Sequence, residues 1–432
     1  MITDPIAIAI LLGAFFLLLA LRTPISFALG ISALATTIYL KIPLFIVVQR
    51  MVAGLESFSM LAIPFFILAG VVMTEGQLAD RLVNLASLFV GRIRGGLAMV
   101  NCLDSMFFGG ISGSAVADVS SLGSIMIPAM QKKGYAKDFA IALTVTTAVQ
   151  AVLIPPSHNM IIYAMATGGS ASIGRLLLAG AVPGFALGFA LMIMCYIMAI
   201  KHKYPREEKH TFREGLKIFR EGVLSVGVAV LIMGGIISGI FTPTESAAVA
   251  VVYAFFLTFA VYRDVPLTRV AKILRDSVTT ISMVFLLIAT STAFGWVLTV
   301  LNVPSAVAGW LTSITQNKYV LLTLVNIFLL IVGMFMDMAP AIIICTPILL
   351  PIMMKVGVNP IHFGVLLMFN LGIGLCTPPV GNALFVGCAV GKAKIEEIIK
   401  PLMVCYIPML VILFLITFFP QIVMFLPNLL MK

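Results

Sequence analysis

Apolar stretches of about 17 to 25 residues recur along the whole chain, and short segments between them carry most of the charges. Each stretch is long enough to cross a hydrocarbon layer of roughly 30 Å as an α-helix. The stretches lack the alternation and the roughly ten-residue length of membrane β-strands. They predict an all-α polytopic membrane protein, with spans at residues 5–21, 24–40, 61–76, 139–168, 176–200, 223–240, 244–262, 277–301, 361–391 and 401–426.

Two further apolar segments, about 97–130 and 319–353, are interrupted near the middle by small and polar residues. We expect each to enter the membrane, turn and leave on the same side, as a re-entrant helical hairpin. Residues 42–58 and 266–276 mix charges with apolar positions beside predicted spans, which favours interfacial amphipathic helices.

The composition excludes a water-soluble fold, because 61% of residues are hydrophobic, 10% are charged and the mean hydropathy is +1.15. Soluble domains carry about 25% charged residues. The first apolar run lacks a basic segment before it, so we expect a retained helix rather than a cleaved signal. The six cysteines stand singly and are expected to be small buried hydrophobes, which indicates neither redox chemistry nor structural zinc.

The net charge of +10 follows a pattern that fixes the expected topology. With residues 201–222 in the cytoplasm and both hairpins returning to their own side, most basic residues lie inside, as the positive-inside rule requires. The inner segments then hold Arg22, Arg81, Arg92, Arg94, Lys132, Lys133, Lys137, the seven basic residues of 201–222, Arg263, Arg269, Lys272, Arg275, Lys392, Lys394 and Lys400. Lys41, Arg50, Arg175, Lys318, Lys355 and Lys432 remain outside, with both chain termini. The positive charge therefore requires no nucleic-acid partner.

The chain resembles itself at long range. Pro155-Pro156-Ser157-His158-Asn159 reappears as Pro378-Pro379-Val380-Gly381-Asn382, an offset of 223 residues. The same offset relates Ile127-Pro128 to Leu350-Pro351, Gly110 to Gly333 and Gly168 to Gly391, and Thr23-Pro24 is repeated as Thr242-Pro243 at an offset of 219. Residues 1–222 and 223–432 are therefore predicted to be two repeats of opposite orientation, each with one hairpin and one broken helix. Inverted repeats with discontinuous helices are typical of secondary transporters.

The proline pairs must interrupt the helices 139–168 and 361–391, because proline lacks a backbone donor and clashes with the preceding turn. Residues 151–154 and 374–377 would then end half-helices whose free carbonyls favour a cation. A proline kink with a packing role alone is the alternative.

The hairpin tips, residues 108–115 and 333–340, combine small residues with polar ones. The helices that follow them would direct backbone N–H groups at an anionic substrate. No Lys-Ser/Thr follows the glycines of the first tip, so a nucleotide P-loop is not supported. The alternative is that the small residues serve close helix packing.

Several polar residues in apolar surroundings are candidates for function. Membrane-embedded carboxylates are functional by default, although each could instead cap a helix; those in question are Asp104, Asp118, Glu245 and Asp337. Asn159 and Asn382 could bind a ligand or hold the broken helices. His158 is matched by Gly381 and is more typical of a packed residue than of a proton relay.

These motifs resemble the large membrane subunit of tripartite ATP-independent periplasmic (TRAP) transporters. The resemblance covers essentially the whole chain and rests on Gly239-Ile240-Phe241-Thr242-Pro243-Thr244-Glu245-Ser246-Ala247-Ala248-Val249-Ala250, Phe108-Gly109-Gly110-Ile111-Ser112-Gly113-Ser114, Leu153-Ile154-Pro155-Pro156-Ser157 and Cys376-Thr377-Pro378-Pro379-Val380-Gly381.

The family implies a sodium-driven elevator transporter in the bacterial inner membrane. It implies a separate small four-helix membrane subunit and a periplasmic substrate-binding protein as partners. The implied substrates are small organic anions: C4-dicarboxylates, sialic acid, sugar acids and keto acids, with the sialic acid branch looking similar. In elevator terms, residues 97–200 and 319–426 would form the transport core and the remainder the scaffold.

One sodium site is expected in each repeat, where the half-helix end meets the hairpin tip. In the second repeat, chemistry and resemblance agree on Gly333, Gly374, Thr377 and Val380; the offset of 223 then gives Gly110, Ala151, Ile154 and Ser157, with Ser112 as a nearby hydroxyl. The expected substrate contacts are Ser114, Asn159, Asp337, Pro340 and Asn382. Sodium is the only expected cofactor.

Two alternatives remain. A stand-alone sodium/dicarboxylate carrier of similar architecture would need no binding protein, but the Thr-Pro-Thr-Glu string argues against it. An intramembrane enzyme would need a catalytic pair, and the sequence has no H-E-x-x-H motif. A channel would favour a continuous polar pore over matched breaks. The chain is therefore expected not to be an enzyme.

Overall fold

The computed structural model describes residues 4–431 except 22, 57, 77, 207–211, 305, 308, 310–314 and 316. Arg22, Lys209 and Lys432, three of the basic residues used for the topology, lie outside the described residues. The described residues form helices and no strand, which confirms the all-α fold class.

The helices up to the middle of the chain are α1 (Pro5–Ala20), α2 (Ile25–Tyr39), α3 (Leu44–Ala53), the 3₁₀ helix η1 (Phe58–Leu61), α4 (Ala62–Glu75), α5 (Leu78–Val90), α6 (Gly96–Ser112), α7 (Ala115–Lys132), α8 (Lys137–Thr147), α9 (Gln150–Leu153), α10 (His158–Ala166) and α11 (Ile173–His202). Those that follow are α12 (Phe212–Ile237), α13 (Pro243–Phe255), the π-helical η2 (Phe256–Tyr262), the 3₁₀ helix η3 (Leu267–Arg269), α14 (Val270–Val300), α16 (Lys318–Phe335), α17 (Met338–Lys355), α18 (Pro360–Leu375), α19 (Asn382–Gly391), α20 (Ile395–Phe418) and α21 (Pro420–Leu430).

Among the described residues, seven helices are long and apolar enough to cross a membrane, or up to nine if each of two bent helix pairs counts as one span. This multi-span character agrees with the apolar stretches of the sequence. Both predicted hairpins are present as helix pairs, α6–α7 and α16–α17, whose arms have 17 or 18 residues. An 18-residue helix is about 27 Å long, so length alone does not separate a re-entrant arm from a span.

Both predicted helix breaks are present. The segment 139–168 becomes α8, α9 and α10, with a bend of 51° before α10. The segment 361–391 becomes α18 and α19, with residues 376–381 between them. The peptide bonds Pro155–Pro156 and Pro378–Pro379 are both cis.

Two predicted elements have different bounds in the structure. The single span 401–426 is two helices, α20 and α21, because Pro420 starts a new helix after Phe419. Most of the predicted interfacial helix 266–276 is the first part of the continuous α14, whereas its counterpart in the first half is the separate helix α3. Helix α5 was not predicted, because charged residues interrupt its apolar run.

Helix starts follow local chemistry. At α13, the Thr242 hydroxyl accepts from the Glu245 backbone N–H at 3.2 Å, and the Glu245 carboxylate accepts from the Thr242 backbone N–H at 2.7 Å. Pro243 occupies the first turn, where its missing donor costs nothing. Of its two possible roles, Glu245 therefore takes that of a helix cap.

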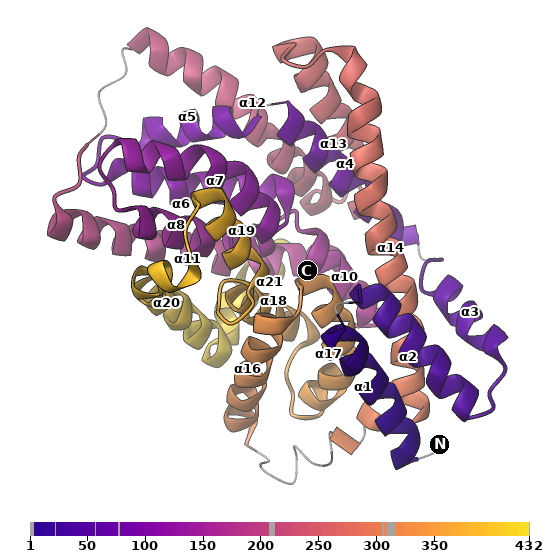
Figure 1. Cartoon of the computed structure of the whole chain (residues 1–432). Helices are drawn as coiled ribbons and strands as arrows, with labels where there is room; N and C mark the ends of the chain where they lie inside the picture. The colour runs from indigo at the N-terminus through magenta and orange to yellow at the C-terminus, as the bar shows by residue number, and fades with distance from the viewer. Residues whose placement is uncertain are drawn as a thin grey trace.

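The helices fall into two groups that mainly pack among themselves. Helices α1–α5 and α12–α14 form one group, in which the long α14 lies against α2, α3 and α4 along one side of the molecule (Figure 1). Helices α6–α11 and α16–α21 form the other group, around the entirely buried stretch Ile361–Leu375 of α18. This grouping parallels the predicted scaffold and transport core, whose roles stay a prediction.

Within the second group, helices from the two halves of the chain pack against each other. The first arm of each hairpin packs against the broken helix of its own half: α6 against α9, and α16 against α18. The second arm packs against both halves: α7 against α8 of its own half and α19 of the other, and α17 against α18 of its own half and α10 of the other. Both hairpins are thereby positioned in part by helices more than about 170 positions away in sequence.

Candidate cation and substrate site

In the first half, the hairpin lies in backbone contact with the helix break. A Cβ atom on Gly109 would lie 2.6 Å from the Ala151 Cα, and one on Gly110 would lie 3.0 Å from the Pro155 carbonyl oxygen. The end of α6 can therefore approach α9 and the proline pair this closely only with glycine at these positions. Predicted sodium-site residues Gly110, Ala151 and Ile154 are thus brought together, and all three are buried.

The tip of the first hairpin lies against the residues that follow the break. A Cβ on Gly113, whose φ is +60°, would lie 3.2 Å from both the His158 backbone nitrogen and the Pro156 carbonyl oxygen. The Asn159 side-chain amide donates to the Gly113 carbonyl at 3.3 Å. Asn159 therefore holds the broken helix to the hairpin, and His158 packs against the tip.

The hydroxyls of the first site differ in their partners. The Ser157 hydroxyl is fully buried and has no hydrogen-bond partner among the described residues. Ser112 Oγ lies 3.4 Å from the Ser114 backbone N–H, which donates to it. Ser114 caps α7, because its hydroxyl accepts from the Ala117 N–H at 3.4 Å. An unpartnered buried hydroxyl beside free carbonyls suits a cation.

In the second half, the contact between hairpin and break is glycine against glycine. A Cβ on Gly374 would lie 2.5 Å from the Gly333 Cα, and one on Gly333 would lie 3.0 Å from the Gly374 Cα. The Gly381 N–H donates to the Met334 carbonyl at 3.0 Å, which ties the residues after the break to the hairpin. Gly333 and Gly374, both predicted sodium-site residues, are therefore adjacent.

The remaining residues of the second site are more accessible. The Thr377 hydroxyl donates to the Ile373 carbonyl at 2.7 Å, which leaves its lone pairs for a further partner. Thr377, Val380 and Asn382 are half-buried, whereas Pro340 is buried. Asp337 stands at the N-cap position of α17 without a side-chain capping bond. Its carboxylate is therefore not used to start that helix.

The first hairpin also contains two buried carboxylates. Neither oxygen of Asp104 has a hydrogen-bond partner among the described residues, and one oxygen of Asp118 accepts from the Ser105 hydroxyl at 2.8 Å. The positions that match Asp104 and Asp118 in the second half are Ile327 and Ala341. These two carboxylates therefore occur in the first repeat alone and are not among the features that the two repeats share.

One residue at the second break was not predicted. The Tyr406 hydroxyl of α20 donates to the Cys376 carbonyl at 2.7 Å, directly before the proline pair. The offset of 223 matches Tyr406 with Pro183, so the repeat gave no signal for it. All six cysteines are buried and free, as expected; the Cys102 and Cys195 sulfurs lie 3.8 Å apart.

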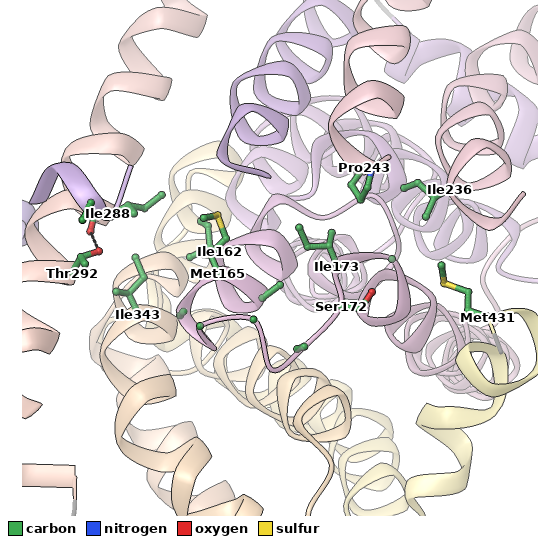
Figure 2. A pocket seen from close by; sticks show the side chains of 18 of the residues that line it. Ile162, Met165, Ser172, Ile173, Ile236, Pro243, Ile288, Thr292, Ile343 and Met431 are labelled. Carbon is green, nitrogen blue, oxygen red and sulfur yellow. Dashed lines mark hydrogen bonds between the residues drawn. The ribbon is translucent and has the colours of Figure 1, made fainter. Parts of the chain in front are cut away.

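A cavity of about 710 Å³ lies at the seam between the two helix groups, beside the end of α10 (Figure 2). Its walls are largely aliphatic, with Ile162 and Met165 of α10 facing Ile288 of α14 and Ile343 of α17. The Thr292 hydroxyl on its wall donates within α14 to the Ile288 carbonyl at 2.8 Å. None of the predicted sodium or substrate residues lines this cavity.

Comparison with known proteins supplies the family context. Residues 12–422 match the family "Tripartite ATP-independent periplasmic transporter, DctM component". The chain is 44% identical to the "Uncharacterized protein YgiK" of Salmonella typhimurium, covering 98% of this chain and 97% of that protein. It is 36% identical to the "C4-dicarboxylate TRAP transporter large permease protein DctM" of Rhodobacter capsulatus, covering 98% and 99%. It is 39% identical to the "Sialic acid TRAP transporter large permease protein SiaM" of Vibrio cholerae, covering 88% and 89%.

A solved structure is also similar. The YdaH transporter of Alcanivorax borkumensis superposes with a TM-score of 0.61 at 14% identity, covering 86% of this chain and 87% of that one. At this identity the likeness concerns the fold alone. It supports the arrangement of the helices described above.

Proposed function

Because the chain belongs to the DctM family of tripartite ATP-independent periplasmic transporters, we propose that it couples the uptake of a small organic anion to sodium. As a transporter permease of a bacterial family, the chain moves a substrate across the inner membrane rather than converting it. The family also implies a tripartite system, with a small membrane subunit and a periplasmic binding protein. The ion, the substrate and the mode of movement are our proposal.

The observation that carries the proposal is the backbone contact between hairpin and helix break in both repeats. Gly109 lies against Ala151 in the first repeat, and Gly333 lies against Gly374 in the second. In each case a half-helix ends there at a proline pair, so the carbonyls four residues before the prolines lack their regular helical donors; the Gly374 carbonyl accepts from the Thr377 N–H at 2.9 Å instead and keeps one lone pair for a cation. Sodium prefers several oxygen ligands, and apolar surroundings leave such carbonyls few other partners.

The proposed ligands are mainly backbone oxygens. In the first repeat these come from Gly110, Ala151 and Ile154, with the Ser157 and Ser112 hydroxyls. In the second repeat they come from Gly333, Gly374 and Val380, with the Thr377 hydroxyl. The unpartnered Ser157 hydroxyl supports this assignment.

The proposed substrate site lies between the two hairpin tips. Helices α7 and α17 begin directly after these tips, and their first N–H groups carry partial positive charge that favours an anion. The polar residues there are Ser114, Asn159 and Asn382, with Pro340 in the first turn of α17. Asp337 would repel an anion, so it fits beside a bound cation that offsets its charge.

The relatives do not narrow the substrate beyond a small organic anion, because proteins named for C4-dicarboxylates and for sialic acid are similarly distant. The proposed movement is an elevator, in which the helices of the α6–α11 and α16–α21 group shift against the others. The seam between the two groups would be the sliding surface.

The proposal is tested by reconstitution. The chain, its small membrane partner and the binding protein are incorporated in or added to proteoliposomes, and uptake of C4-dicarboxylates, sialic acid, sugar acids and keto acids is measured. Uptake is expected to require an inward sodium gradient and all three proteins, and to survive proton uncouplers. Uptake driven equally by a proton gradient would overturn sodium coupling, and uptake by this chain alone would favour the stand-alone carrier.

The proposed orientation, with both termini in the periplasm, has its own test. A cysteine at Lys132 should react only from the cytoplasm, and one at Lys318 only from the periplasm. The Lys132 side chain is exposed, and the Lys318 side chain is partly exposed. Labelling of the two positions from the same side would overturn the inverted orientation of the hairpins.

A further inference from the structure

The first part of α12 carries a row of exposed cations. Arg213, Lys217 and Arg220 are spaced by four and three residues, so they share one face of the helix. None of the three forms an ion pair or a side-chain hydrogen bond with another described residue. Figure 1 shows the start of α12 at the periphery of the molecule, beside α5.

The opposite face of this segment packs on the protein. A Cβ on Gly222 would lie 2.6 Å from the Leu85 Cβ of α5, and one on Gly215 would lie 3.8 Å from Leu88. Since a helix repeats every 3.6 residues, positions 215 and 222 lie about 180° from the row of cations. The cations therefore point away from the protein.

An apolar stripe runs along the helix beside the cations. Leu216, Phe219 and Val223 are 60%, 46% and 42% exposed, and Val230 further along is 64% exposed. A surface groove of about 650 Å³ combines both stripes; it is lined by Arg213, Leu216, Lys217, Phe219, Arg220, Glu221, Val223 and Leu224. The stripe therefore leads from the charged end of α12 into its membrane-spanning part.

We propose that this groove binds one anionic phospholipid of the cytoplasmic leaflet. The phosphate would lie between Arg213, Lys217 and Arg220, because guanidinium groups bind phosphate oxygens in pairs and lysine adds a point charge. One acyl chain would follow Leu216, Val223 and Val230 toward the bilayer interior. Residues 213–237 form a helix apolar enough to cross a membrane, which sets its basic end at the membrane surface.

Three cations and one carboxylate, that of Glu221, line the groove, so its charge is net positive and favours a lipid with a net negative charge over a zwitterionic one. The exposed Glu214 and the rim residue Glu221 lie on the side of the helix away from the apolar stripe. They would orient the headgroup toward the cations without meeting the acyl chain. The site does not depend on which anion the transporter carries.

The test uses purified full-length protein in nanodiscs of phosphatidylcholine with a minor share of phosphatidylglycerol. Retained phosphatidylglycerol is counted by native mass spectrometry after release into mild detergent. The variant combines Arg213→Gln, Lys217→Gln and Arg220→Gln. The matched control combines Arg92→Gln, Arg94→Gln and Lys132→Gln, which removes the same residue types from exposed positions predicted to lie on the same side.

We expect phosphatidylglycerol retention to fall at least about tenfold in the variant relative to the wild type, since each cation near the surface contributes to attraction of an anionic lipid. The control trio should retain it, and Arg213→Lys with Arg220→Lys should preserve most of it. Equal retention by variant and wild type would overturn the site. Equal loss in the control trio would mean a diffuse charge effect and would also overturn the site.

Discussion

The two helix breaks share a proline pair but differ in how exposed their residues are. Around the first break, Ala151, Ile154 and Ser157 are at most 4% exposed. Around the second, Thr377 and Val380 are half-buried, and Pro379 is exposed. A matched sequence therefore does not produce a matched environment, and the second break lies nearer the surface of the chain.

The close contacts at the two breaks differ as well. The second break joins two glycines, whereas in the first a glycine meets Ala151, which already carries a Cβ. At the first break the buried Ser157 hydroxyl has no described hydrogen-bond partner, whereas at the second the Cys376 carbonyl accepts a hydrogen bond from the Tyr406 hydroxyl. The first site is thus closed and incompletely satisfied, and the second is open and braced by a neighbouring helix.

The largest expected effect comes from Gly374→Ala. The new Cβ would lie 2.5 Å from backbone atoms of Gly333, which cannot move like a side chain. Such overpacking costs about 1–3 kcal/mol. We expect nearly complete loss of uptake in proteoliposomes and a lower melting temperature.

The reciprocal change in the first repeat, Ala151→Gly, removes an existing Cβ and should retain most of the uptake. If Gly374→Ala transports normally, the second contact is looser than its geometry indicates. Close backbone packing would then not distinguish the second break from the first.

A second prediction concerns accessibility. In solubilised protein, Val380→Cys should react with a polar thiol reagent at least about tenfold faster than Ser157→Cys, because a buried position must open before it reacts. The six native cysteines are all buried and set the background. Equal labelling rates would mean that the difference in burial does not persist in solution.

A third prediction concerns the ions. Ser157→Ala and Thr377→Ala should each raise the sodium concentration for half-maximal uptake about three- to tenfold, as expected for loss of one polar contact. Thr377→Ala should also lower the melting temperature slightly, since it removes the bond to Ile373. Ser157→Ala should not lower it, because that hydroxyl has no described partner.

The matched control for these variants is Thr299→Ala, an exposed hydroxyl that bonds only within α14. It should leave the sodium dependence unchanged. An unchanged dependence in both Ser157→Ala and Thr377→Ala would place the ions elsewhere and would remove the functional meaning of the repeat.

The smallest expected effect separates the two matched asparagines. Asn159→Ala removes the bond to the Gly113 carbonyl and should destabilise the protein by about 1 kcal/mol. Asn382 makes no hydrogen bond from its side chain to a described residue, so Asn382→Ala should leave the melting temperature unchanged. Equal shifts in melting temperature would show that the hydrogen bond from Asn159 to Gly113 does not stabilise the first hairpin tip.

Features with a local cause could be predicted from the sequence. The spans follow from apolar length, the hairpin turns from small and polar residues, and the breaks from Pro155-Pro156 and Pro378-Pro379. The adjacency of Gly333 and Gly374 was predictable because the helix break and the family resemblance pointed to both. In each case, one property of the chain dictates the structure nearby.

Features that depend on distant packing could not be predicted. Helix α5 has charged residues such as Asp80 and Arg81 that conceal it from an apolar scan, and it becomes stable by packing on α12. Tyr406 reaches the second break from α20, with no signal in its own segment. Which break is buried depends on how the helices close around it, and both breaks carry the same prolines.

The crossed packing of the hairpins has a consequence for the origin of the chain. Besides its neighbours in its own half, α7 packs on α19 and α17 packs on α10, so a chain of half this length would leave one side of its second hairpin arm uncovered. Two copies of such a half-chain would cover these arms by packing them on each other's half-helices. An ancestor of half the present length would therefore have been stabilised as a pair, and gene fusion would have joined two subunits that already packed on each other.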